Sequence, residues 1–255
     1  MLKFLRLFFL HAVVFSFTDL AAAQSADSTG LNMETVYNRP AFHSSGNHTA
    51  IGGYSEMKAE KFFADGQPEP MEFNLQRISF FLRTKVSDKI RFLIEGEFIN
   101  GGKQINLNCS AVDFRFCSLF NLRGGVIINP IGIFNQVHDG PLYEFTDRPF
   151  SSTEILPSTF SSAGFGFYGL KKINNWAIGY EAYITNGFSY AIIDNESRHT
   201  LLSASVENGM LPMKETNGQM MMNGKFSVRQ KNAGELGLSW RGGCIQYFSN
   251  SGITT

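Results

Sequence analysis

The sequence carries little charge and no excess of either sign. Only 17% of its 255 residues are charged, whereas an average soluble domain has about 25%. Its 22 Lys and Arg residues match 22 Asp and Glu residues, which gives a formal net charge of +0. A protein that binds the phosphate backbone needs a basic surplus. The balance therefore argues against nucleic acid as a partner.

Cysteine is scarce, and the number and spacing of the cysteines do not favour disulfide bridges. The three residues are Cys109, Cys117 and Cys244, an odd number that fits poorly with a disulfide scaffold. If 109–117 is one strand, eight steps of about 3.3 Å separate Cys109 from Cys117, which is too far for a bridge. A Cys109–Cys244 bridge stays open. No CxxC motif or Cys/His cluster indicates a metal site, so neither a metal nor a cofactor is expected.

Long apolar runs are also missing, although apolar residues are common. Nowhere do 18 apolar residues follow one another, which argues against a helical membrane protein. Hydrophobic residues nevertheless make up 43% of the chain, which has 25 Phe, 25 Gly and a mean hydropathy of −0.09. Apolar residues spread over every second position would give this composition. It is typical of a membrane β-barrel.

The N-terminus has the three parts of a secretory signal. Lys3 and Arg6 precede a short apolar stretch over 7–17, and Ala21–Ala23 offers a small-residue cleavage site. A histidine interrupts the apolar stretch, which disfavours the alternative of an N-terminal anchor helix. We therefore expect residues 1–23 to be a signal peptide and 24–46 a flexible leader.

From residue 47 onward, period-2 hydrophobicity alternates with clusters of turn-forming residues, which indicates strands. The predicted fold class is all-β, an antiparallel transmembrane β-barrel over 47–255 with about nine strands. The strands are expected near 47–60, 71–85, 89–100, 109–117, 121–134, 162–170, 176–187, 223–230 and 234–249.

Alternation also predicts what each face of the strands presents, since successive side chains point to opposite sides of a sheet. One face should meet lipid, with Phe92, Phe98, Phe114 and Phe116 on it. The other should line a wet lumen. The candidate pore-lining residues are Arg77, Arg83, Arg91, Glu95, Glu97, Asp113, Arg115 and Arg123.

The connections between these strands alternate in length. Those at 62–70, 101–108, 135–161 and 188–222 are long, and those at 86–88, 118–120, 171–175 and 231–233 are short. Short turns at one end and longer loops at the other are typical of outer-membrane barrels.

The segment 135–161 is a candidate constriction loop, because its aromatic and apolar content argues against disorder. Opposed charges across a pore filter solutes by sign and size. The candidate residues are His138, Asp139, Glu144, Asp147, Arg148 and Glu154. The alternative is a solvated loop face without selectivity.

Two motifs suggest chemistry without supporting it. Gly164–Gly169 matches G-x-G-x-x-G, but a dinucleotide site needs a helix to open on these glycines, and here a second strand follows. His138-Asp139 comes without a G-x-S-x-G elbow, and adjacency in sequence does not make a catalytic triad. We expect no enzyme activity and no catalytic residue.

Ordered motifs over roughly 50–190 resemble the O/P-type porins, often labelled phosphate-selective porins. The resemblance is strongest over 121–187. The segments that carry it are FNLQRISFFLRTKVSDKIRFLIEGEF, Asn129-Pro130-Ile131-Gly132, His138, Arg148-Pro149-Phe150 and Gly164-x-Gly166-x-Tyr168-Gly169. It implies a water-filled, trimeric barrel for passive uptake of small hydrophilic or anionic solutes across the outer membrane of a Gram-negative-type bacterium. Phosphate preference stays open, because the inferred lumen mixes arginines with Glu95, Glu97 and Asp113.

The strand count departs from that family. Bacterial single-chain barrels have an even number of strands, and channel-forming ones have about 16–18. The chain also lacks the final aromatic-ended strand that such proteins usually present. We therefore expect the N-terminal part of a longer porin that does not close alone. Alternatives are a small structural or adhesive surface barrel without channel activity and, less favoured, a barrel enzyme.

Overall fold

The described residues form one curved antiparallel sheet. The computed structural model describes residues 48–142, 147–152, 155–156, 159–187 and 220–243. The sheet has nine strands, and each pairs with its neighbours in the sequence. The strands are β1 (Thr49–Ala64), β2 (Gln67–Lys85), β3 (Ile90–Ile99), β4 (Gln104–Arg115), β5 (Asn121–Ile128), β6 (Ser161–Ile173), β7 (Trp176–Asn186), β8 (Met220–Gln230) and β9 (Gly234–Gly243).

The all-β class and the nine strands are as the sequence predicts. Residues 1–23 and 24–46, expected to be a signal peptide and a leader, lie outside the described residues. So does Cys244, and with it the possible bridge to Cys109. Cys109 itself is buried in the core, and Cys117 is an exposed thiol just past β4.

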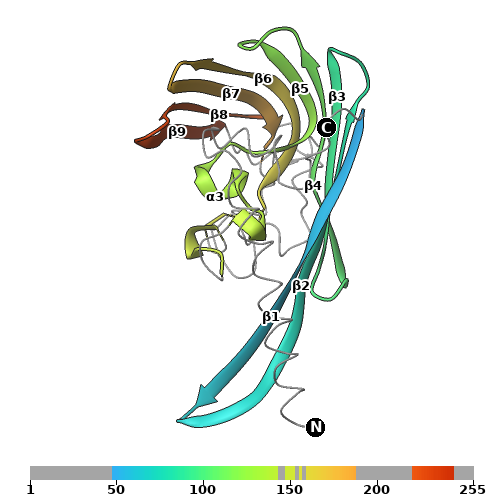
Figure 1. The fold of residues 1–255 in the computed structure, drawn as a ribbon, viewed down its shortest axis with the longest axis vertical. Helices are drawn as coiled ribbons and strands as arrows, with labels where there is room; N and C mark the ends of the chain where they lie inside the picture. Colours follow the sequence, from blue (N-terminus) through green and yellow to red (C-terminus); the bar gives the residue numbers. More distant parts are fainter. Residues whose placement is uncertain (1–47, 143–146, 153–154, 157–158, 188–219, 244–255) are drawn as a thin grey trace, which may run out of the picture.

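The expected loop at 62–70 is wrong. β1 and β2 instead continue to a two-residue turn at Asp65-Gly66, where both residues have positive φ, 50° and 78°. Asp-Gly with two positive φ values is the type I′ hairpin, whose twist matches that of the strands. The resulting hairpin projects beyond the rest of the sheet, since β3 pairs with β2 only over Arg77–Lys85 (Figure 1).

The expected loop at 101–108 is also mostly strand. β4 begins at Gln104, after a turn in which Gly101 and Gly102 take positive φ. At this end of the sheet the β1–β2 and β3–β4 connections are therefore tight turns. Among the connections that the structure describes, the long one at this end joins β5 to β6. The lengths of the connections were therefore predicted less accurately than the strands, which follow from the alternation of hydrophobic residues.

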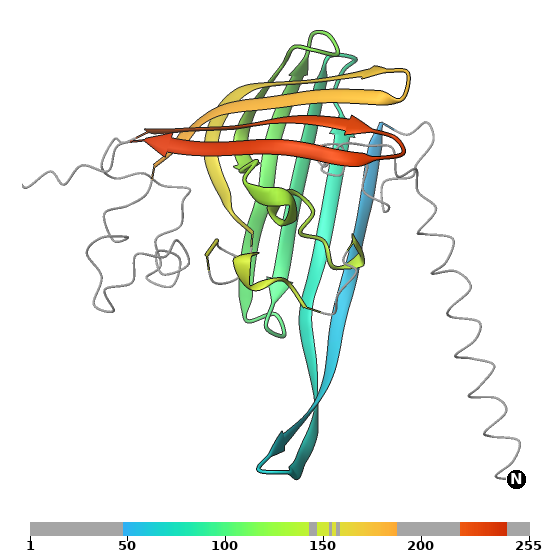
Figure 2. The ribbon, with the colours of Figure 1, turned by 90° about the vertical axis from the view of Figure 1, so that its left-hand side faces the viewer.

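The strand expected over 121–134 ends early, at Ile128. Pro130 has no N–H for a sheet ladder, and Gly132 has a φ of 68° that leaves the extended region. Residues Gly132–Gln136 form the short helix α3 instead. The 3-10 turns η2 (Gly140–Leu142) and η3 (Phe150–Ser152) follow. The sheet curls around these segments, so that α3 lies on its concave side (Figures 1 and 2).

The small apolar core lies on the same concave side. Phe81, Leu93, Cys109, Ala111 and Ile128 form a buried cluster. The Tyr54 ring packs against Phe81 with ring centroids 5.9 Å apart. Phe81, which breaks the alternation of 76–85, is thus an inward-facing apolar residue among charged ones.

The opposite, convex face is mostly apolar. Phe92, Phe98 and Phe114 lie on it, and Phe116 lies just past β4 beside Phe120, with ring centroids 5.8 Å apart. No helix in the described part of the chain is long and apolar enough to cross a bilayer. The large apolar side chains exposed on this face are Ile51, Phe80, Phe98, Ile105, Leu107, Phe114, Phe165, Phe167, Trp176, Ile178, Ile184, Met222, Phe226, Leu236, Leu238 and Trp240.

Candidate functional site

The structure places all eight candidate pore-lining residues on the concave face. The strand registers show this directly, since Ser79 pairs with Glu97 and Asp113 pairs with both Arg91 and Arg123. Arg77, Arg83 and Arg115 follow by alternation within their own strands. The charged face and the apolar face therefore belong to the same strands.

Arginines gather on this face near the short turns at 86–89 and 116–120. The guanidinium groups near these turns are close enough to repel one another electrostatically. They belong to Arg83, Arg91 and Arg115. Arg115 is exposed, and Arg83 and Arg91 are half-buried. Three cations at this spacing make a positive surface at one end of the concave face.

A buried pair lies beside these arginines. Arg123 contacts Asp113 through two parallel hydrogen bonds, Nε to Oδ1 at 2.7 Å and Nη2 to Oδ2 at 2.9 Å. The guanidinium also lies 4.8 Å from the centre of the Tyr168 ring. Because Asp113 is paired with Arg123, this one carboxylate offsets only part of the combined positive charge of Arg83, Arg91 and Arg115.

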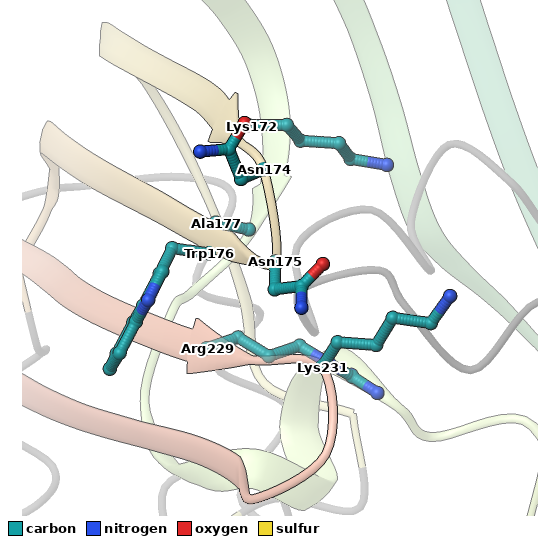
Figure 3. A pocket seen from close by; sticks show the side chains of 7 residues that line it. All are labelled: Lys172, Asn174, Asn175, Trp176, Ala177, Arg229 and Lys231. Atoms are coloured by element: carbon teal, nitrogen blue, oxygen red, sulfur yellow. The ribbon is translucent and has the colours of Figure 1, made fainter.

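A second basic group lies at the turns β6–β7 and β8–β9 (Figure 3). The pocket there has a volume of about 200 Å³ and includes Lys172, Arg229 and Lys231. In the strand registers Lys172 and Arg229 both pair with Ala177, so a small residue separates two long cations on the concave face. The backbone N–H of Lys231 donates to the carbonyl of Asn175 at 2.9 Å, which joins the two turns.

The loop after β5 contacts the middle of the same face through His138. Its Nε2 lies 2.7 Å from Oε1 of Glu95 on β3, and its Nδ1 lies 3.0 Å from the carbonyl oxygen of Asn135. Asn108 donates to the same Glu95 oxygen at 3.1 Å. His138 and Glu95 are each only 1% exposed.

Glu97 lies next to this contact. Its Oε1 accepts hydrogen bonds from Ser79 at 3.0 Å and from Arg77 at 3.4 Å. Arg77 also pairs with Glu56 on β1, with Nε and Oε2 at 2.8 Å. Glu95, Glu97 and His138 are also the side chains best placed to hold a metal ion among the described residues.

A separate set of contacts fixes α3 to the far side of the sheet. The side chain of Gln136 donates to Glu181 on β7 at 2.5 Å and accepts from Lys225 on β8 at 2.9 Å. Tyr183 donates to the other Glu181 oxygen at 2.9 Å. All four side chains are buried, so the loop is attached to both halves of the curved sheet.

The other candidate constriction residues do not share one environment. Asp139 is buried, Arg148 donates to the His138 carbonyl at 2.9 Å, and the exposed Asp147 pairs with Lys58 of β1 at 3.0 Å. Glu144 and Glu154 lie outside the described residues. His138 therefore serves the contact between loop and sheet, and the buried Asp139 is not part of an exposed ring of charge.

Sequence reasoning missed Gln136, Glu181 and Lys225. Glu181 is the one charged residue of β7 and lies on its inward face, which is a signal that alternation could have given. Gln136 carries no such signal, because its role depends on how the loop folds back.

The glycine motif has no nucleotide-binding context. Gly164–Gly169 lies inside β6, which runs into a tight turn and then β7. A Cβ at Gly166 would collide with the Ala182 carbonyl oxygen and the Tyr183 ring. Gly166 therefore allows β6 to pack closely against Ala182 and Tyr183 of β7.

Comparisons with known proteins leave the family open. No family model matches the sequence. An uncharacterized protein of Aquifex aeolicus (strain VF5) is 31% identical over 146 residues, which are 54% of this chain and 32% of that protein. The chain thus matches about a third of the length of this relative.

The comparison with solved structures found OmpTdeltaL8, a loop L8 deletion mutant of OmpT, an outer membrane protein of Vibrio cholerae. The match covers 77% of this chain and 70% of that one, with 10% identity and a TM-score of 0.33. At this level the likeness adds nothing to what the strands themselves show.

Proposed function

We propose that the chain forms the wall of a water-filled outer-membrane pore for passive diffusion of small hydrophilic solutes. The observation that carries this proposal is the opposite character of the two faces of one sheet. Buried or half-buried charges, among them Glu95 and Arg123, occupy the concave face, and exposed Phe, Leu, Ile and Trp residues cover the convex face. Monomeric soluble proteins rarely expose so large an apolar surface. A bilayer would cover it.

The basic end of the concave face supports a preference for anions. Arg83, Arg91 and Arg115 gather there, and Lys172 and Arg229 lie on the same face near the neighbouring short turns. The carboxylates of Glu95 and Glu97 lie farther along the strands, in contact with the loop. Separation of the two signs along the strands makes one mouth of the proposed pore positive, which would concentrate anions.

Phosphate fits the chemistry of this basic end. A guanidinium binds phosphate oxygens through two parallel hydrogen bonds, and three arginines offer several such donors. Chloride and carboxylates would be drawn by the same charge, so the proposal names small anions with phosphate among them. The resemblance to O/P-type porins supports the same reading, together with a trimeric assembly and no catalysed reaction.

The loop between β5 and β6 would narrow this pore. It lies on the concave side, and contacts to Glu95 and Glu181 attach it to two separate parts of the wall. A loop fixed at two points reduces the open cross-section without closing it.

Solute uptake into proteoliposomes tests the proposal. The protein, extracted from membranes of cells that express its gene, is compared with the Arg83→Gln/Arg91→Gln/Arg115→Gln variant. We expect phosphate uptake to fall at least several-fold in the variant while uptake of a neutral sugar changes little. Equal loss for both solutes would contradict anion preference, and no uptake of either by the natural protein would favour a surface barrel without channel activity.

A further inference from the structure

We propose that Glu95, Glu97 and His138 form a binding site for one divalent transition-metal ion of the zinc class. All three side chains are buried, and one ligand atom from each lies within 4.8 Å of the others. The glutamates are two positions apart on β3, so both carboxylates are on the concave face. The loop after β5 supplies the imidazole.

The hydrogen bonds of His138 point to a cation between the imidazole and Glu95. A carbonyl oxygen only accepts, so Nδ1, 3.0 Å from the Asn135 carbonyl, carries the hydrogen. In a neutral imidazole the other nitrogen, Nε2, then has a lone pair. That lone pair faces a carboxylate oxygen at 2.7 Å, which is also an acceptor. Either a proton or a metal ion must join these two atoms.

The charge of the surroundings favours the metal ion. Glu97 shares Arg77 with Glu56, so one guanidinium serves two carboxylates. Asp139, which follows His138 in the chain, is also buried, and Arg148 donates to the His138 carbonyl rather than to either glutamate in the contacts described above. Buried carboxylates are costly unless opposite charge compensates them. A divalent ion supplies two positive charges, whereas an imidazolium supplies one.

The groups around the three side chains have the features of a second ligand shell. A histidine that binds a metal usually donates its other ring N–H to a carbonyl or carboxylate, as His138 does to Asn135. Asn108 and Ser79 donate to the Glu95 and Glu97 oxygens and so hold the carboxylates in place. One imidazole and two carboxylates suit zinc, whereas Mg²⁺ and Ca²⁺ prefer oxygen ligands alone.

Metal binding requires only a small shift of the side chains. Zinc bonds to His and Glu are about 2.0–2.2 Å, which puts tetrahedral ligand atoms roughly 3.4 Å apart. The 2.7 Å contact between His138 and Glu95 would open, and the 4.8 Å limit of the cluster would contract. The ion would then link the loop to β3. Its binding energy would stabilise the loop in the position where His138 contacts the sheet.

Zinc titration of the metal-free protein tests the site. The full chain is stripped with EDTA, and zinc binding is followed by calorimetry alongside His138→Gln, Glu97→Gln and the control Glu72→Gln, whose exposed side chain lies in β2. We expect one zinc ion per chain for the natural protein and the control, and at least a 100-fold loss of affinity in the other two variants. Mg²⁺ should not compete.

Two further readouts keep the test decisive if His138→Gln does not fold. Co²⁺ bound to the natural protein should give visible d–d bands typical of nitrogen and oxygen ligands, and zinc should slow proteolysis within 135–161. A natural protein that binds no zinc would overturn the proposal and leave a proton as the link between His138 and Glu95. Equal zinc affinity in the His138→Gln variant would overturn it as well. Neither result depends on whether the protein conducts.

Discussion

Arg123 and Asp113 face each other across β5 and β4 in a fork-to-fork pair, with hydrogen bonds of 2.7 and 2.9 Å. Their side chains are 4% and 6% exposed, so water compensates neither charge. The two side chains, from adjacent strands, thus form an ion pair with no net charge on a face that otherwise carries many charged groups.

Asp113→Asn should lower the free energy of unfolding markedly. Removal of one partner from a buried ion pair leaves the other charge uncompensated and costs about 3–5 kcal/mol. Urea denaturation followed by tryptophan fluorescence measures the loss. Asp88→Asn is the matched control, since Asp88 is 93% exposed and pairs with Lys85 at the surface. Equal stability of the two variants would mean that Asp113 is not buried in the folded protein.

Asn135→Ala should release the loop without unfolding the sheet. The Asn135 amide donates to the carbonyls of Asn129 and Phe160 at 2.7 and 2.9 Å and accepts from the Phe160 N–H at 2.7 Å. It therefore holds both ends of the loop together. Each buried backbone group left without its partner costs about 1–3 kcal/mol.

Limited proteolysis measures that release. We expect new cleavage within 135–161 in Asn135→Ala and the natural pattern in Gln104→Ala, which removes an amide from the exposed start of β4. Cleavage in the β2–β3 or β4–β5 turns instead would show that the whole sheet, rather than the loop, depends on Asn135.

Gly166→Ala should destabilise the sheet far more than Gly96→Ala. A Cβ at Gly166 would overlap the Ala182 backbone and the Tyr183 ring, whereas a Cβ at Gly96 would make an ordinary 3.7 Å contact with the Asn106 oxygen. Forcing an extra methyl group into a packed site costs about 1–3 kcal/mol. The urea midpoints of the two variants give the comparison, and a Gly166→Ala midpoint equal to that of Gly96→Ala would refute the packing role.

Phe80→Arg should impair folding into lipid while Val86→Arg should not. Phe80 lies on the convex face of β2, 52% exposed, and packs edge-on against Phe98 with centroids 5.9 Å apart. Arginine on a lipid-facing strand costs about 2–4 kcal/mol near the bilayer centre. Val86 is 63% exposed but lies in the β2–β3 turn.

Folding into lipid vesicles, followed by heat-modifiable gel mobility, separates these two variants. A folded yield for Phe80→Arg equal to that for Val86→Arg would show that the convex face meets water rather than lipid.

The alternating charges of β3 and β4 were enough to predict which side chains share a face. That pattern repeats at every second residue, and a strand can satisfy it in only one way. Strand ends were harder, because Asp65-Gly66 and Pro130 act through local backbone geometry rather than through hydrophobicity. The contacts of Gln136 and His138 could not be predicted at all, since they depend on how a long loop returns to strands far away in the sequence.

Single-channel recording in a planar lipid bilayer tests the central claim most directly. The nine described strands alone are not expected to close. The assembled protein is therefore extracted from membranes of cells expressing its gene and added to one side of the bilayer, under a salt gradient. We expect stepwise, ohmic currents and a reversal potential whose sign shows that anions cross more readily than cations. Protein that enters the bilayer, as shown by its heat-modifiable mobility, yet gives no current steps would contradict the account.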